Sequence, residues 1–424
     1  MARIVLNTFG SFGDLHPYLA IGIELRRRGH SVLIATSEVY RAKIEAEDVA
    51  FAPVRPDVAE LLERPDLLEK LWNPTHGTEY LIRDYLMPQV DQSYEDLLNA
   101  CARADLLITH FAAYAGPTVA EVLNLPWLSV ALQPSIFLSV DDPPVLPPLW
   151  LKHLYHLGRS VTAAIFALGK LRVKSWAKPL LELRQKLGLS ASANPVFDAQ
   201  YSPFGSLALF SRHFARPQRD WPPNVKMCGF VFYDRRGEGF GSTGAADDLM
   251  RFLDNGPAPI VFTLGSSAVM HPGAFYRESL AAARHLGMRA VLLVGANGRD
   301  TLPREIPPTV FVTEYAPYSE LLPRAALTVH HGGIGTTAQA LRAGKPMIVV
   351  PWSHDQPDNA SRLGKLGVSR TISRSRYTAQ IVESEIGRLL QDSGVRHGAA
   401  QLGAYIAAEN GLQTACDAIE AALR

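Results

Sequence analysis

The sequence predicts an α/β protein in which two doubly wound, Rossmann-like domains face each other across a cleft. In both halves of the chain, short apolar runs of strand character alternate with helical stripes. The halves are separated by residues 233–247, which are rich in glycine and charge and have no apolar period. A chain of 424 residues is also longer than one ordinary core requires. In such sheets ligands bind outside the carboxyl ends of parallel strands, so the site is expected in the cleft.

The amino-terminal half begins with a βαβ unit. An apolar strand at residues 3–8 leads through a turn at residues 9–14 into a helical stripe at residues 17–28, which ends at Gly29. The other elements expected in this half are strands at residues 31–35, 104–109 and 127–132 and a helix at residues 116–123.

The carboxyl-terminal half repeats the alternation. The expected strands are residues 259–264, 290–294, 309–312, 326–329 and 346–351, and the expected helices are residues 274–286 and 336–343. A polar loop is expected at residues 353–358.

Residues 143–190 depart from the alternation and allow three interpretations. A proline-rich loop is followed by apolar sequence that cations interrupt. The segment could form amphipathic helices packed over the sheet, or an apolar wall of a binding cleft. Contact with a membrane surface is a third interpretation, because cations flank the apolar residues: Lys152, Arg159, Lys170, Arg172 and Lys174.

Composition narrows the functional classes. A formal net charge of +1 gives no electrostatic reason to expect nucleic acid as a partner. The three cysteines, Cys101, Cys228 and Cys416, are too few and too far apart for a disulfide framework or a zinc site. Neither a signal peptide nor a run of about 20 apolar residues is recognisable, so a cytoplasmic protein is expected. A monomer and a homodimer both stay open.

The most informative segment runs from the apolar residues 326–329 into a glycine-rich turn that opens a helix. Such a turn presents free backbone N–H groups and the positive end of the helix dipole to an anion, usually a phosphate. The downstream pair Asp355 and Gln356 can hydrogen-bond hydroxyls, so a phosphate and a sugar are expected side by side. Tight strand–helix packing is the alternative reason for the glycines. The turn matches neither the Walker loop nor GxGxxG, and the chain contains no GxSxG nucleophile elbow.

The stretch from Tyr315 to Gln356 resembles the donor-binding signature of nucleotide-diphosphate-sugar glycosyltransferases. This group includes plant natural-product, sterol, macrolide and glycopeptide-antibiotic glycosyltransferases. Tyr315-Ala316-Pro317-Tyr318 is similar to the W-x-P-Q element, whose aromatic ring stacks on the nucleobase. The turn from His331 to Thr336 is similar to the element that grips the diphosphate, and Asp355-Gln356 to the pair that holds the sugar hydroxyls.

The resemblance implies the GT-B fold and a donor site. It implies an acceptor-binding domain at residues 1–232, a linker at 233–257, a donor-binding domain at 258–404 and a closing helix at 405–424 that crosses back. The implied donor-binding residues are Gly13, Gly265, Ser266, Ser267, Tyr315, Ala316, Tyr318, His331, Gly333, Gly335, Thr336, Gln339, Trp352, Asp355 and Gln356.

Three departures from the family pattern concern the nucleotide. Tyr315 replaces the family's tryptophan, Gln339 replaces the glutamate that binds the ribose, and Tyr318 replaces a glutamine. The choice between UDP and dTDP donors therefore stays open, although the resemblance favours UDP-glucose.

The catalytic base has two candidates. By resemblance, Asp14 occupies the position where many relatives carry a catalytic histidine and where the sterol and glycopeptide branches also carry an aspartate. His110 occupies the position of the aspartate that orients the histidine in those relatives. His16, two residues after Asp14, is the rival base. A carboxylate base needs a pKa raised by burial or an acidic acceptor. The structural alternatives are helix capping for Asp14, capping or packing for His16 and a buried, satisfied ring for His110.

These features predict an inverting transferase that moves a hexose from a UDP-sugar to a hydroxyl of a lipophilic or aromatic small molecule. The acceptor should lie against the amino-terminal domain and residues 143–190. Asp-x-Asp and zinc-ligand spacings are missing, so no metal site is expected, and no cofactor beyond the nucleotide sugar as co-substrate. The leaving-group charge would be neutralised by His331, the turn amides, Thr336 and the helix dipole. A nucleotide-sugar epimerase or hydrolase and a non-catalytic binding protein are the alternatives.

Overall fold

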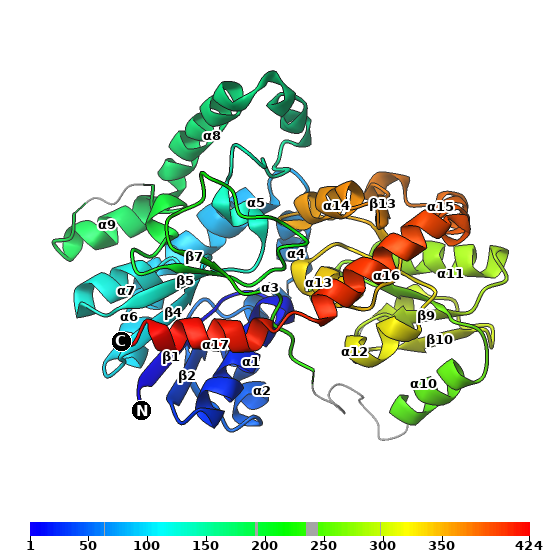
Figure 1. Cartoon of the computed structure of the whole chain (residues 1–424), viewed down its shortest axis with the longest axis horizontal. Coiled ribbons are helices and arrows are strands. Elements are labelled where there is room, and N and C mark those ends of the chain that lie inside the picture. Colours follow the sequence, from blue (N-terminus) through cyan, green and yellow to red (C-terminus); the bar gives the residue numbers. More distant parts are fainter. Residues whose placement is uncertain (63, 191–193, 235–244, 297) are drawn as a thin grey trace. The chain divides into compact units, whose positions relative to one another are not determined.

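The computed structural model describes residues 1–424 except 63, 191–193, 235–244 and 297. The chain forms two compact units (Figure 1). Unit 1 consists of Met1–Tyr233 together with Asn410–Arg424, and unit 2 consists of Asp234–Glu409. Each unit is built on one parallel sheet, so the predicted fold class is confirmed.

Unit 1 contains a seven-stranded sheet with the order β3-β2-β1-β4-β5-β6-β7, and every neighbouring pair is parallel. Its strands are β1 (Arg3–Asn7), β2 (Ser31–Thr36), β3 (Ala50–Pro53), β4 (Leu106–His110), β5 (Trp127–Ala131), β6 (Ser206–Ala208) and β7 (Val225–Met227). Every residue of β4 and β5 is buried, as expected for central strands covered on both faces.

Unit 2 contains a six-stranded parallel sheet with the order β10-β9-β8-β11-β12-β13. Its strands are β8 (Ile260–Thr263), β9 (Ala290–Leu293), β10 (Val310–Thr313), β11 (Leu327–His330), β12 (Met347–Val349) and β13 (Ser369–Thr371).

Helices connect the strands in both units. Those of unit 1 are α1 (Phe12–Arg27), α2 (Arg41–Glu45), α3 (Ala59–Leu62), α4 (Pro65–Leu71), α5 (Gly77–Glu79), α6 (Val90–Cys101), α7 (Gly116–Leu123), α8 (Arg159–Lys174), α9 (Lys178–Lys186) and α17 (Gly411–Ala421). Those of unit 2 are α10 (Ala245–Asp254), α11 (Phe275–His285), α12 (Tyr318–Leu321), α13 (Ile334–Arg342), α14 (Gln356–Lys365), α15 (Ala379–Gln391) and α16 (Ser393–Ala407).

Both sheets reverse their strand order at one point. In unit 1 the chain adds β2 and β3 on one side of β1 and continues with β4 on the other side, and in unit 2 the same happens around β8 and β11. Connections leave such a pair of strands in opposite directions and open a crevice at the carboxyl ends. A ligand site is therefore expected in each unit between β1 and β4 or between β8 and β11, and these two places are called the crevices of the units.

The first helix begins five residues earlier than the sequence predicts. Ser11 caps α1: its hydroxyl accepts a hydrogen bond from the N–H of Gly13 at 3.2 Å, and its own N–H donates to the carboxylate of Asp14 at 2.7 Å. This reciprocal capping box starts the helix at Phe12 and leaves Pro17 inside it. The predicted turn at residues 9–14 is therefore shorter than expected.

Two predicted boundaries also differ from the structure. The expected linker at residues 233–257 contains α10, a helix of unit 2 whose Leu249 and Leu253, four residues apart, are buried on one face; residues 235–244 lie outside the described residues. The expected closing helix at 405–424 is in fact the end of α16, a break at Asn410 and α17, of which only α17 belongs to unit 1.

The helix α17 is tied to the end of α1 by Arg28. Its guanidinium lies 2.6 Å from Asp417 and 2.8 Å from Glu420, and 2.9 Å from Glu24 of α1.

In the described part of the chain, no helix combines the length and the hydropathy that spanning a bilayer requires.

Candidate active site

The crevice of unit 1 brings Asp14 and His110 together. Asp14 lies in the first turn of α1, directly after β1, and His110 is the last residue of β4. The Nε2 atom of His110 lies 3.9 Å from Oδ1 of Asp14. Gly10 makes room for the carboxylate, because a Cβ at this position would lie 2.2 Å from Oδ2 of Asp14, and its φ of +134° suits glycine.

Burial sets the electrostatics of this pair. It raises the pKa of Asp14, while His110 and the hydrogen bonds from Ser11 act in the opposite direction. Burial also lowers the pKa of His110, and the Asp14 carboxylate opposes this shift. The two pKa values thus move towards each other, so a carboxylate with raised basicity lies beside an imidazole whose protonated form is disfavoured.

Asp14 has a structural role as well as a chemical one. Its Oδ2 accepts the hydrogen bond from the Ser11 N–H, so the capping role considered from the sequence is present. Oδ1 is the oxygen that faces His110. Each oxygen of the carboxylate therefore serves a different partner.

His16 lies on the same helix in an aromatic environment. Its ring is 5.4 Å from that of Phe12 and 5.1 Å from that of Tyr233. These contacts match the packing role considered from the sequence.

Tyr18 was not predicted as part of this crevice. It follows Asp14 by four residues on α1, is fully buried, and meets the ring of His110 edge-on at 6.2 Å. Among the described residues its hydroxyl has no hydrogen-bond partner. The spacing of four residues on one helix face was the available signal.

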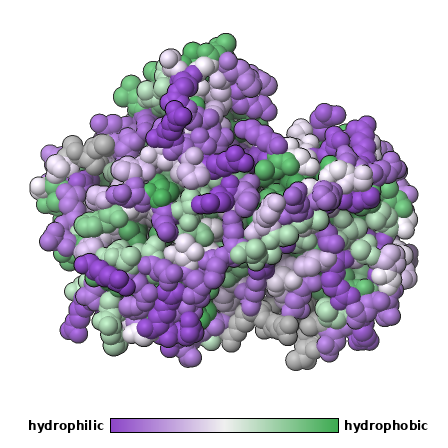
Figure 2. All heavy atoms as spheres, in the orientation of Figure 1, coloured by the Kyte–Doolittle hydropathy of each residue, from purple (hydrophilic) through white to green (hydrophobic). Residues whose placement is uncertain are grey.

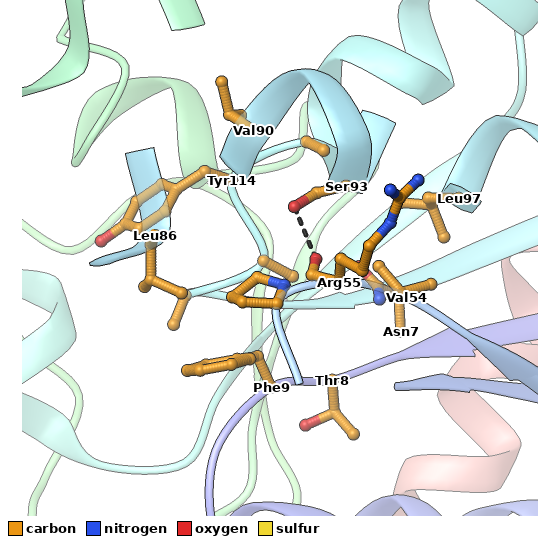
Figure 3. Close-up of a pocket in the computed structure, with 14 residues that line it drawn as sticks. Asn7, Thr8, Phe9, Val54, Arg55, Leu86, Val90, Ser93, Leu97 and Tyr114 are labelled. Carbon is orange, nitrogen blue, oxygen red and sulfur yellow. Dashed lines mark hydrogen bonds between the residues drawn. The ribbon is translucent and has the colours of Figure 1, made fainter. Parts of the chain in front are cut away.

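A small hollow lies beside this crevice, at the carboxyl ends of β1 and β3 (Figure 3). Its volume is about 30 Å³, enough for a water molecule or a methyl-sized group and too small for an aglycone. The hydroxyl of Ser93 closes one side by donating to the carbonyl of Arg55 at 2.6 Å. The other lining residues are mostly apolar and include Phe9, Val54, Leu86, Val90, Leu97 and Tyr114.

The crevice of unit 2 is built around the imidazole of His331, directly after β11. The ring lies against two glycines: a Cβ on Gly333 would be 2.4 Å from its Nε2, and a Cβ on Gly265 would be 2.5 Å from its Cε1. Gly265 follows β8, so the ring joins the turns of the two strands that flank the crevice. Close approach to His331 thus explains Gly265 and Gly333.

Burial favours the neutral form of the His331 imidazole. Burial lowers its pKa to about 3, and the neighbouring His330 contributes in the same direction. Burial also lowers the pKa of His330 to about 3, and Nδ1 of His330 accepts a hydrogen bond from the Gly332 N–H at 3.1 Å. At neutral pH His331 can therefore meet an anion as an N–H donor rather than as a cation.

The first turn of α13 supplies further donors. Gly333 is its N-cap, so the N–H groups of Ile334, Gly335 and Thr336 lack intrahelical partners. These amides and the positive end of the helix dipole lie at the amino-terminal end of α13, which borders the crevice. An anion bound there is stabilised.

Tyr318 has a role in this crevice that the sequence did not reveal. Its phenol lies 2.8 Å from the hydroxyl of Thr263 at the end of β8, and it also hydrogen-bonds the side chain of Thr336. Thr336 is thereby fixed at the start of α13.

Tyr315, in contrast, is 38% exposed on the loop after β10, as stacking on a base requires, and Ala316 is buried.

The Asp355–Gln356 pair begins α14, so the predicted loop at residues 353–358 is shorter than expected. Oε1 of Gln356 accepts from the N–H groups of Trp352 at 2.7 Å and Ser353 at 3.2 Å. Its amide nitrogen is then the group left to meet a sugar hydroxyl. Asp355 accepts from Asn359 at 2.6 Å.

Two other predicted donor residues have different surroundings. The indole of Trp352 is buried between Phe275 and Arg374, so it supports the turn from within the core. The amide nitrogen of Gln339 donates to Asp234 at 3.3 Å, and its oxygen accepts from Arg342 at 2.7 Å. Arg342 also pairs with Asp234 at 2.6 Å, so both ends of the Gln339 amide are engaged.

The remaining predicted residues lie in the turns. The N–H of Gly13 is used by the Ser11 cap in unit 1, and the N–H of Gly265 donates to Thr263 at 3.2 Å. Ser266 is exposed and Ser267 is half-buried just beyond Gly265.

Comparisons with known proteins identify the family and the fold. Residues 4–140 match the glycosyltransferase family 28 N-terminal domain, and residues 277–420 match the erythromycin biosynthesis protein CIII-like C-terminal domain. O-mycaminosyltylonolide 6-deoxyallosyltransferase of Streptomyces fradiae is 30% identical over 99% of this chain and 97% of its own length. Sterol 3-beta-glucosyltransferase of Aspergillus oryzae is 28% identical over 98% of this chain, which spans 30% of that protein.

Solved structures share the fold over the whole chain. The calicheamicin glycosyltransferase CalG4 gives a TM-score of 0.74 at 18% identity and covers 100% of this chain and 98% of its own. The spinosyn rhamnosyltransferase SpnG, solved with thymidine diphosphate, gives 0.68 at 18% identity and covers 96% of this chain and 97% of its own.

The fold is that of the GT-B glycosyltransferases. The chain belongs to the glycosyltransferase family that includes the S. fradiae enzyme.

The packing of His331 against Gly333 leads to a first prediction. In Gly333→Ala the new Cβ would displace the imidazole, so affinity for UDP should fall by about tenfold or more, the loss expected for one or two hydrogen bonds to a charged group. Isothermal titration calorimetry measures this. Gly387→Ala, where a Cβ meets nothing within 4 Å, is the matched control and should bind UDP like the wild type. Equal affinity in the two variants would contradict the placement of the anion at His331.

The Asp14–His110 pair leads to a second prediction. Asp14→Asn keeps an oxygen for the Ser11 cap but removes the ionisable carboxylate, so turnover should fall on the order of a thousandfold. UDP affinity should stay unchanged, since the predicted donor-binding turns lie in unit 2. Ser11→Ala, which weakens the cap by about 1 kcal/mol but keeps the carboxylate, should retain most turnover.

The pH dependence checks the same assignment. Because the pKa of Asp14 is raised above its ordinary value of 3.8, Asp14 becomes protonated at a higher pH than an ordinary aspartate does. As the pH is lowered, kcat/KM should therefore begin to fall while the pH is still above 3.8. In His110→Gln this limb should move to higher pH, since His110 lowers the pKa of Asp14. Normal turnover by Asp14→Asn would reject Asp14 and favour His16.

Proposed function

We propose that the protein transfers a hexose, with glucose as the first candidate, from a UDP-sugar to a hydroxyl of a lipophilic or aromatic small molecule. The observation that carries the proposal is the pairing of two crevices in one chain. One holds a buried carboxylate of raised pKa, and the other holds an anion site of neutral donors.

In the proposed reaction Asp14 takes the proton of the acceptor hydroxyl. The acceptor oxygen forms a bond to the anomeric carbon while the bond from that carbon to the diphosphate oxygen breaks, so the configuration inverts. His110 supports the step by exchanging the proton with Asp14. The released diphosphate is met by the first-turn amides of α13, Thr336 and the N–H of His331.

The neutral donors support a reaction without a metal. Backbone amides and the helix dipole stabilise a developing oxyanion in a site that excludes water. His331 gains a proton more readily when a diphosphate binds, because an adjacent negative charge raises the pKa of an imidazole.

The names of relatives support the substrate classes. The A. oryzae relative is a sterol glucosyltransferase, and the S. fradiae relative acts on O-mycaminosyltylonolide. Both names are consistent with a lipophilic hydroxyl compound as acceptor, and the first with glucose as the sugar.

The surroundings of Gln339 bear on the nucleotide. With both ends of its amide engaged by Asp234 and Arg342, Gln339 has little left to offer a ribose 2′-hydroxyl. We therefore propose that UDP-sugars are the donors but that dTDP-sugars are also accepted.

The function is tested by incubating the enzyme with flavonoid, sterol and macrolide acceptors and with UDP- and dTDP-sugars, in the presence of EDTA. Mass spectrometry should detect a glycoside of at least one acceptor, and the glycosidic bond should have the anomeric configuration opposite to that of the donor. His331→Ala should lose both UDP affinity and product. Release of free sugar without any glycoside would indicate a hydrolase, and loss of all product with EDTA would contradict the metal-free mechanism.

A further inference from the structure

A helical arm of unit 1 carries more exposed apolar surface than the proposed reaction explains. The arm comprises two short 3₁₀ segments, Leu149–His153 and Tyr155–Leu157, and the helix α8. Figure 1 shows α8 standing away from the sheet of unit 1, and Figure 2 shows apolar side chains gathered at this end.

The helix α8 presents apolar side chains on its outer face. Its buried residues, Thr162 and Phe166, are four apart and form the inner face. Leu168 and Leu171, three apart, lie on the opposite face and are 68% and 70% exposed. A helix on a water-exposed surface normally carries polar residues there.

The 3₁₀ segments of the arm also carry exposed apolar side chains. Trp150 is 59% exposed and Leu157 is 67% exposed. Four large exposed apolar side chains on one arm point to an interaction site, whereas isolated exposed leucines need no explanation.

The charges around the patch have one sign. Residues 143–181 contain no aspartate or glutamate, while the arm and the residues that follow it carry six cations: Lys152, Arg159, Lys170, Arg172, Lys174 and Lys178. This contrasts with the net charge of +1 for the whole chain.

Carboxylates outside the arm offset these cations only in part. Arg159 pairs with Asp141, Lys170 with Asp198 at 2.6 Å, Arg172 with Glu79 at 3.4 Å and Lys178 with Glu182 at 3.6 Å. Surface pairs of this kind contribute about 0–1 kcal/mol, so their cations can exchange partners. Among the described residues, Lys152 and Lys174 form no ion pair.

We propose that the outer face of the arm binds the surface of an anionic phospholipid bilayer. Leucines enter the boundary between headgroups and acyl chains, tryptophan lies at the headgroup level, and cations meet lipid phosphates. A symmetric contact between two copies through this face is disfavoured, because it would bring cations of the same sign together. This membrane binding does not depend on glycosyl transfer. It would hold the protein at a surface where lipophilic compounds concentrate.

Co-sedimentation with vesicles tests the proposal. The wild type should bind vesicles of equimolar phosphatidylcholine and phosphatidylglycerol, bind phosphatidylcholine alone much more weakly, and be released by salt. Leu168→Gln/Leu171→Gln should lower binding to the mixed vesicles about tenfold or more. Lys152→Gln/Lys174→Gln should lower it several-fold and weaken the salt dependence.

Matched variants separate the arm from general effects. Leu123→Gln/Leu366→Gln changes two exposed leucines outside the arm, and Arg299→Gln/Arg304→Gln removes two exposed cations of unit 2; both should bind vesicles like the wild type. Unchanged UDP affinity and melting temperature show that the arm variants are folded.

Three results would overturn the proposal. They are wild-type-like vesicle binding by Leu168→Gln/Leu171→Gln, equal binding to the two kinds of vesicle, and no vesicle binding by the wild type. In the last case, light scattering that shows a dimer dissociated by Leu168→Gln/Leu171→Gln would assign the face to contact between copies.

Discussion

The reversal of strand order beside β1 and again beside β8 is the constraint on which both candidate sites depend. A ligand crevice is expected there, at the carboxyl end of each sheet. Asp14 lies in the first turn of the helix that follows β1, and Gly265 lies in the turn that follows β8. A histidine ends each second strand, His110 in β4 and His330 in β11, and His331 comes directly after His330.

The same topology gives opposite chemistry in the two crevices. In unit 1 the capped helix contributes a carboxylate, and burial makes this group more basic. In unit 2 the uncapped amides of α13 contribute partial positive charge, and burial keeps His331 neutral. The proposed base for the acceptor and the proposed anion site for the leaving group therefore lie at the same point of two similar sheets, and the residues of the turns make them differ.

The sequence predicts the central strands well, because they are continuous apolar runs buried on both faces. It does not predict β3, β6, β7 or β13, whose three or four residues form no run long enough to distinguish them from loops. The start of α1 is misplaced because Pro17 suggests a helix start, whereas the Ser11–Asp14 capping box lies earlier.

For the candidate site, too, the sequence indicates some features and the structure alone reveals others. The family resemblance singles out Asp14, His110, His331 and the Asp355–Gln356 pair, and their roles stay predictions; the structure shows that Asp14 and His110 lie close together. Contacts between distant segments are not visible in a motif, so the phenol of Tyr318 on Thr263 and the engagement of Gln339 by Asp234 emerge only from the structure. The lowered pKa of His331 also emerges only from the structure, because the ring is buried by Gly265 of a distant segment as well as by its own turn.

Nuclear magnetic resonance of ¹⁵N-histidine-labelled protein tests the central claim that the diphosphate is held by a buried, neutral His331. Signals of His331, identified by their loss in His331→Asn, should show a neutral ring as the pH is lowered to about 5, well above its pKa of about 3. Addition of UDP at neutral pH should shift these signals. Titration of His331 near the ordinary value of 6.5, or signals that UDP leaves unchanged, would contradict the account.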